Sequence, residues 1–196
     1  MGLRLLTPPA VEPVTVAEQK AFMRVDIADD DAVIALFITA ARQAVEVLTG
    51  RAFITQKWQA SFDIVPIGKR LELPIAPVVS VESVRVADVT ETLRVLDSSE
   101  YAVDALAEPA RITLHTYSRP PHWRHRINAA EVTFTCGYGA AATDVPEGLR
   151  QAVRFLTSHF YENRTPVGDA SNTHYEELPM GVQYLLAPYR LWGRHL

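Results

Sequence analysis

Apolar residues recur with two different periods along this chain. Towards both ends they return every three or four positions, which is the spacing of an amphipathic helix. Between residues 54 and 143 they alternate in short runs that are rich in β-branched side chains and are separated by Pro, Gly, Asp and Ser, which is typical of strands. The pattern therefore predicts helices at both ends of the chain and an antiparallel sheet between them.

Two helices are predicted in the N-terminal part. Thr15 and Glu18 have the spacing of a capping box, so the first helix begins there and carries on its expected inner side Ala17, Ala21 and Phe22. The second helix begins within residues 29–31 and ends before Gly50, because glycine is a common residue at a helix C-terminus. Its predicted buried face consists of Ala32, Val33, Leu36, Phe37, Ala40, Ala41, Ala44, Val45 and Leu48.

The C-terminal part predicts a third helix and a short fourth one. Pro146 marks the start of the third helix, and its predicted buried stripe consists of Leu149, Ala152, Val153, Leu156 and Phe160. Pro166 and Gly168 end this helix, and a short amphipathic segment follows. Strands are expected within residues 56–64, 78–87, 93–96, 101–103, 111–115 and 131–136. The expected fold is α+β: a single domain over residues 1–196, with a small helical bundle built from residues 1–53 and 144–196 and a β-rich insertion over residues 54–143.

Composition narrows the function. With 196 residues, 48% of them hydrophobic, the chain is long enough to bury one sizeable core. Its 19 Lys and Arg against 23 Asp and Glu give a net charge of -4, which excludes binding of nucleic acid by overall electrostatic attraction. The apolar run of residues 1–6 is too short for a signal peptide, so we expect neither a targeting segment nor a membrane span. The only cysteine, Cys136, excludes an intrachain disulfide and is predicted to be a small buried hydrophobe.

Two groups contain residue types that occur in catalytic sites, but neither group is a complete catalytic site. Asp26 and residues 29–31 have the oxygens that Mg²⁺ prefers, but carboxylates at this place also favour a helix start, and no phosphate-binding glycine loop accompanies them. Ser158, His159 and Glu162 share a predicted helix but lack a nucleophile elbow, so a packed or capping histidine is favoured. No catalytic residue, metal ligand or cofactor is predicted.

A basic loop and the C-terminus carry the candidate binding residues. No acidic residue lies between Glu108 and Glu131, and the basic loop candidates are Arg119, His122, Trp123, Arg124, His125 and Arg126. Arginine beside an aromatic residue suits phosphate or base contacts, whereas a zinc site would need ligands beyond the two histidines. The loop is interpreted as solvated, or as facing an acidic neighbour or passing DNA. The C-terminal residues are of the types enriched at protein interfaces, and the interface candidates are Tyr184, Tyr189, Arg190, Trp192 and Arg194.

The order and spacing of several short motifs resemble the head-to-tail connector, or adaptor, proteins of long-tailed phages and gene transfer agents. Each motif is degenerate alone, and the specificity lies in their succession over nearly the whole chain. The motifs are Pro13 to Lys20, Arg24-Val25-Asp26 followed by Asp29-Asp30-Asp31, Ala40 to Arg51, Leu73-Pro74-Ile75-Ala76-Pro77-Val78, Cys136-Gly137-Tyr138-Gly139, Val145 to Leu149, Tyr161 to Arg164, Leu178 to Val182 and Leu185 to Arg190.

The resemblance implies a structural virion protein that is not an enzyme. It would form a ring of about twelve copies under the portal, join the capsid to the tail and surround the channel for double-stranded DNA, without sequence-specific binding. Its partners would be other copies of itself, the portal protein and the next neck or tail protein, at the head-tail junction of a particle assembled in the bacterial cytoplasm, with no membrane involved. One alternative is a stand-alone nucleic-acid-binding module that uses the loop from Arg119 to Arg126. Another is an enzyme whose site is not recognised.

Overall fold

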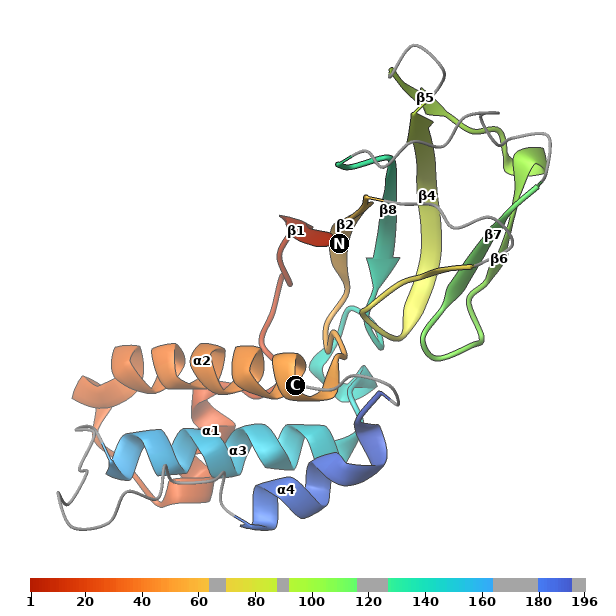
Figure 1. Cartoon of the computed structure of the whole chain (residues 1–196). Helices are drawn as coiled ribbons and strands as arrows, with labels where there is room; N and C mark the ends of the chain where they lie inside the picture. Colours follow the sequence, from red (N-terminus) through yellow and green to blue (C-terminus); the bar gives the residue numbers. More distant parts are fainter. Residues whose placement is uncertain (64–69, 88–91, 116–126, 164–179, 192–196) are drawn as a thin grey trace, which may run out of the picture. The chain divides into compact units, whose positions relative to one another are not determined.

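The computed structural model describes residues 1–63, 70–87, 92–115, 127–163 and 180–191. The chain divides into two compact units, which are described separately (Figure 1). The sheet unit comprises Met1–Pro9, Thr55–Tyr138 and Leu191–Leu196, and the helical unit comprises Ala10–Ile54 and Gly139–Arg190. Helices and antiparallel sheets are both present, which confirms the predicted α+β class.

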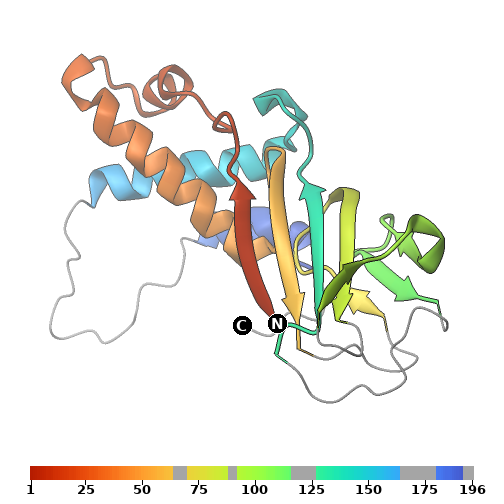
Figure 2. The same ribbon diagram turned by 90° about the horizontal axis from the view of Figure 1, so that it is seen from above.

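Among the described residues, the sheet unit contains two antiparallel sheets. The larger sheet has the order β1-β2-β8-β4-β5, and its strands β1, β2, β8 and β4 run side by side in Figure 2. Its bounds are β1 (Gly2–Thr7), β2 (Gln56–Phe62), β8 (Ala130–Cys136), β4 (Val78–Ala87) and β5 (Leu93–Val95). The smaller sheet has the order β3-β7-β6 and consists of β3 (Leu71–Glu72), β7 (Arg111–Leu114) and β6 (Tyr101–Asp104).

The larger sheet has one buried and one polar face. Along β8 every second residue is buried, ending with Cys136, which confirms the prediction for this cysteine. The alternate positions of β8 and its neighbours form polar pairs: Gln59 donates to Glu131 at 2.8 Å, and Lys57 forms an ion pair with Glu82 at 2.8 Å. Strand period and side-chain polarity therefore agree, as expected for a sheet that covers a core on one side.

The helical unit contains α1 (Val16–Met23), α2 (Asp31–Thr49), α3 (Glu147–Glu162) and α4 (Met180–Leu186). Its 3₁₀ turns are Ala28–Asp30, Ala142–Asp144 and Ala187–Tyr189. Helix α3 packs against both α2 and α4 and lies between them in Figure 1, and α1 contacts α2 and α3. The buried apolar side chains of this unit include Ile34, Ile38, Ala41, Val45, Leu149, Ala152, Val153, Leu156, Val182 and Leu186.

The predicted capping box of α1 is confirmed, but its predicted inner side is wrong. Glu18 N donates to Thr15 Oγ1 at 3.2 Å, and Thr15 N donates to Glu18 Oε2 at 2.8 Å. Ala17, Ala21 and Phe22 are exposed, whereas Gln19 is buried. The Gln19 amide donates to the Arg154 carbonyl at 3.2 Å and to Ser158 Oγ at 3.1 Å, so a polar contact with α3 determines which side of α1 faces inward.

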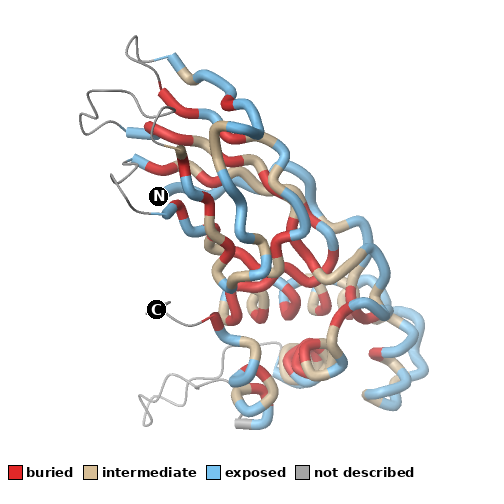
Figure 3. The backbone as a smooth tube through the Cα atoms, turned by 90° about the vertical axis from the view of Figure 1, so that its right-hand side faces the viewer, coloured by how far each residue is buried: buried red, intermediate tan, exposed pale blue. Residues whose placement is uncertain are grey.

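The predicted buried face of α2 is correct only in part. Ala41 and Val45 are buried, but Ala32, Leu36 and Ala40 are exposed. The buried positions, red in Figure 3, follow a different stripe that consists of Ile34, Ile38, Ala41, Arg42, Val45 and Thr49. Because nearly every side of this helix is apolar, periodicity alone could not select the inner face.

Candidate assembly interface

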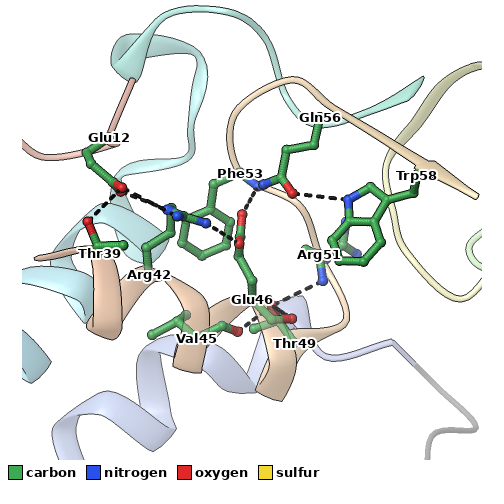
Figure 4. Close-up of polar contacts among 10 residues, drawn as sticks. All are labelled: Glu12, Thr39, Arg42, Val45, Glu46, Thr49, Arg51, Phe53, Gln56 and Trp58. Atoms are coloured by element: carbon green, nitrogen blue, oxygen red, sulfur yellow. Dashed lines mark hydrogen bonds and ion pairs between the residues drawn. The ribbon is translucent and has the colours of Figure 1, made fainter. Parts of the chain in front are cut away.

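An ion-paired cluster on the inner side of α2 contains the only charged residues of this helix after Asp31 (Figure 4). Arg42 Nε donates to Glu12 Oε2 at 2.7 Å, and Arg42 Nη1 donates to Glu46 Oε2 at 2.7 Å. Thr39 Oγ1 also donates to Glu12, at 3.0 Å. Glu46 Oε1 accepts from the Phe53 backbone N-H at 2.8 Å. The cluster therefore links α2 to the chain segments that precede α1 and follow α2.

The cluster pairs one guanidinium with two carboxylates, so one positive charge meets two negative charges and the formal charge is -1. Burial alone would lower the pKa of the Arg42 guanidinium, but the hydrogen bonds and charges of Glu12 and Glu46 outweigh burial and leave that pKa raised. Arg42 therefore stays protonated, although its side chain is only 7% exposed. As a consequence, no charged residue is left on the outer side of α2 beyond its first turn.

The outer α2 face is an exposed stripe without charge. We define it as Ala32, Leu36, Ala40, Gln43 and Val47, which are all exposed, with Leu36 at 69% and Val47 at 64%. At 100° per residue these positions lie within about 80° of one another, opposite the buried stripe. Residues 28–49 are long and apolar enough to cross a membrane by length and composition, a test that core helices also pass, and α2 packs against α1 and α3.

A second exposed apolar surface lies on the other helices of the same unit. We define the aromatic patch as Phe22 of α1, Phe155 of α3 and Tyr184 of α4, which are 42%, 39% and 77% exposed. The rings of Phe22 and Phe155 are tilted, with centroids 5.8 Å apart. Gly181 lies next to Phe155, since a Cβ placed on it would be 3.9 Å from Phe155 Cε2. Gly181 therefore brings the backbone of α4 close to this edge of the Phe155 ring.

Three of the C-terminal interface candidates, Tyr184, Tyr189 and Arg190, lie within the described residues and differ in their surroundings. Tyr184 and Arg190 are exposed, whereas Tyr189 is half-buried against the first turn of α3, where a Cβ on Gly148 would lie 3.2 Å from its Cε2. The Tyr189 carbonyl also accepts from Arg51 Nε at 2.6 Å. Tyr189 thus contributes to the packing of the helical unit. The other two candidates, Trp192 and Arg194, lie outside the described residues.

The basic loop candidates also lie outside the described residues, namely Arg119, His122, Trp123, Arg124, His125 and Arg126. The acidic group before α2 forms polar contacts with other side chains: Asp30 accepts from Tyr161 Oη at 2.5 Å, and Asp31 accepts from Lys20 Nζ at 2.6 Å. Asp30 occupies the N-cap position without a side-chain capping bond. Within the described ranges no group of three or more His, Cys, Asp or Glu side chains is arranged to hold a metal ion.

Sequence reasoning did not find either exposed surface of the helical unit. The outer α2 face contains residues that periodicity assigns to the core, and Phe22 and Phe155 of the aromatic patch are not among the candidates. The signal that would have found the outer α2 face is the lack of charged residues over a helix of 19 residues. A surface helix normally has a charged or polar outer side.

Comparison with known proteins agrees with the resemblance in the sequence. A family model described as "Head completion protein" matches residues 12–191. A chain of the "Virion of native gene transfer agent (GTA) particle" superposes with a TM-score of 0.75 at 25% identity, covering 100% of this chain and 98% of that chain. A chain of the "Neck of empty GTA particle computed with C6 symmetry" gives 0.76 at 26% identity with the same coverage.

A chain of the "Neck of native GTA particle computed with C12 symmetry" gives a TM-score of 0.69 at 25% identity, covering 98% of this chain and 97% of that chain. The search of curated proteins found no match. The structural matches extend over essentially the full length of both chains, so they include the sheet unit as well as the helical unit. Because the family model matches most of the sequence, the chain belongs to the head completion protein family.

Proposed function

We propose that this chain is a head-to-tail connector that forms a closed ring of about twelve copies in the neck of a phage-like particle. The observation that carries the proposal is its similarity, over essentially its full length, to chains of gene transfer agent necks computed with C6 and C12 symmetry. In this role the protein is structural and has no catalytic activity. It lies under the portal, joins the capsid to the tail and surrounds the DNA channel.

A closed ring places a demand on each subunit. With twelve copies, each subunit is rotated by about 30° from the next, and one surface of each copy contacts a different surface of its neighbour. Such a heterologous interface needs two separate docking surfaces on one chain. The outer α2 face and the aromatic patch are two exposed apolar surfaces of the helical unit, which supports this type of assembly.

The net charge supports a channel that DNA passes through without binding tightly. Each copy carries a net charge of -4, and repeating it around a ring adds no overall attraction for phosphates. Tight nonspecific binding to DNA depends on many Lys and Arg contacts with phosphates. We therefore propose the portal above and the next neck or tail protein below as the partners of the ring, with double-stranded DNA as a passing occupant.

Loss of the protein in a strain that produces the particle tests this function. The expected result is heads that contain DNA but carry no tails, with tails restored when the intact gene is supplied in trans. Electron microscopy scores the fraction of particles with tails, and nuclease resistance of the packaged DNA reports on head filling. Complete, tailed particles in the absence of the protein would contradict a connector function.

A further inference from the structure

We propose that the ring closes by docking the outer α2 face of one copy onto the aromatic patch of the next copy. This inference rests on the proposed ring function and names the two surfaces that form its repeated contact. The outer α2 face consists of Ala32, Leu36, Ala40, Gln43 and Val47, and the aromatic patch consists of Phe22, Phe155 and Tyr184.

The charged residues of α2 are few and lie off its outer face. Over its 19 residues the helix has three charged side chains: Asp31 in its first turn, the buried Arg42, and Glu46, which lies beside the buried stripe and pairs with Arg42. From Ala32 to Val47 the outer side therefore presents about 22 Å of helix without a charge. A helix that faces water permanently normally carries charged or polar residues there. Contiguous exposed apolar surface of this kind marks a site that a partner covers.

The two surfaces lie on different helices of the helical unit. Helix α3 lies between α2 and α4 (Figure 1), and the positions of the outer α2 face lie opposite the buried stripe of this helix. Tyr184 of α4 and the outer α2 face therefore lie on different sides of the unit. Two separate surfaces are what a head-to-tail ring requires, whereas a two-fold dimer needs only one self-complementary surface.

The outer α2 face and the aromatic patch are chemically complementary, which favours a second copy of the chain as the partner. The outer α2 face alternates small residues, Ala32 and Ala40, with the larger Leu36 and Val47, so that its surface is ridged. The aromatic patch offers rings that fill hollows between such ridges while burying a large apolar area. The three residues of the patch carry no formal charge, and neither do the five of the outer α2 face, so copies meet without burying an unpaired ion.

Cross-linking in assembled particles tests the contact. Particles are produced with the variant Leu36→Cys and Tyr184→Cys and treated with a short bismaleimide, and the chain is followed on a denaturing gel. The expected result is a ladder of covalent multimers beyond the dimer, because each copy then links to two neighbours. The native Cys136 is buried, so unsubstituted particles provide the background. The pair Leu36→Cys with Leu106→Cys is the matched control, because Leu106 is 97% exposed and lies in the sheet unit.

Other cross-linking results would contradict the inference, and each would point to a different arrangement. Dimers from Leu36→Cys alone would show that two α2 faces meet each other. If necks that contain the ring give no ladder, the ring closes through other surfaces, whereas a neck that lacks the chain would overturn the proposed function itself.

The free protein provides a further check, because the thiol introduced by Leu36→Cys should react rapidly with a maleimide before assembly and at least tenfold more slowly in particles. Equal protection in the free chain would show that the chain itself covers this face.

A charge placed on the same surface gives a readout that does not depend on cross-linking. Leu36→Glu should reduce the number of tailed particles at least tenfold while the circular dichroism of the purified protein stays unchanged, because the Leu36 side chain is 69% exposed. Leu106→Glu, the same change at a more exposed position, should leave tailed particles at the wild-type level. Normal assembly with Leu36→Glu would overturn the inference.

Discussion

The replacement of Arg42 by Met removes the positive charge at the centre of the ion-paired cluster. The side chains of Arg42 and Glu46 are 7% and 13% exposed, and that of Glu12 is 30% exposed. Methionine preserves much of the side-chain volume without offering a donor. The substitution therefore leaves two carboxylates close together, and Glu46 loses its strongest partner while it remains mostly buried.

The expected loss of stability follows from how much water can reach each carboxylate. Removing one partner of a buried ion pair costs about 3 to 5 kcal/mol. Glu12 regains part of its hydration because it is partly exposed, and Glu46 retains the hydrogen bond from Phe53 N at 2.8 Å. We therefore expect a loss of about 3 kcal/mol in the free energy of unfolding, near the lower end of that range.

Urea unfolding followed by circular dichroism at 222 nm measures this loss in the helical signal. The double variant Arg42→Met with Glu46→Gln serves as the matched control, because it also removes the negative charge that Arg42 neutralises in the native protein. It should recover about half of the lost stability or more. A single variant that loses less than about 1 kcal/mol would refute the reasoning, since the cluster would then behave as an exposed ion pair.

Three further predictions concern the helical unit. Thr157 Oγ1 is buried without a hydrogen-bond partner among the described residues, so Thr157→Val should raise the free energy of unfolding by about 1 kcal/mol, and a decrease would reveal a partner for the hydroxyl. The pKa of Glu18 is lowered from 4.5, chiefly by the hydrogen bond from Thr15 N; this carboxylate therefore stabilises the fold above pH 4.5, and that contribution is lost as pH falls through the lowered pKa. Glu18→Gln should flatten this part of the stability profile, and an identical profile would contradict the assignment. Gly50 has φ 71°, so Gly50→Ala should cost about 1 kcal/mol in urea unfolding, with no loss expected if the helix ends elsewhere in solution.

Local signals explain why the ends of the helices could be predicted from the sequence. The capping box at Thr15 and the glycine at position 50 act within a few residues of the backbone that they terminate. Strand β8 could be predicted equally well from its alternating pattern, because this central strand has one buried face along its whole length. In these elements the short-range pattern and the tertiary environment require the same residues.

The missed elements depend on contacts that are distant in the sequence. Strand β1 has six residues that are all exposed, and it pairs with β2, so that Leu3 faces Ala60 across a long sequence separation. Neither burial nor alternation identifies such an edge strand beforehand. Strand β3 has two residues and exists through its pairing with β7. Both strands required knowledge of their partners.

For the candidate interface, too, the sequence alone does not tell which apolar residues are buried. Exposed apolar residues of α2, such as Leu36, have the sequence signature of core residues, and only the structure separates the exposed positions of this helix from the buried ones. Tyr189 is an interface candidate by its residue type, and the structure shows it packed in part against α3, so that its place at an interface stays a prediction. Composition identifies the residues that gain from burial, but it does not say which molecule buries them.

A structure of the neck determined from purified particles without imposed symmetry tests the central claim most directly. The connector model predicts density for this chain at the head-tail junction, in a closed ring of about twelve copies that surrounds the DNA channel and contacts the portal on one side. The same map shows whether Leu36 of each copy lies against Tyr184 of its neighbour. Absence of the chain from the neck, or its presence there as isolated copies that do not enclose the channel, would contradict the claim.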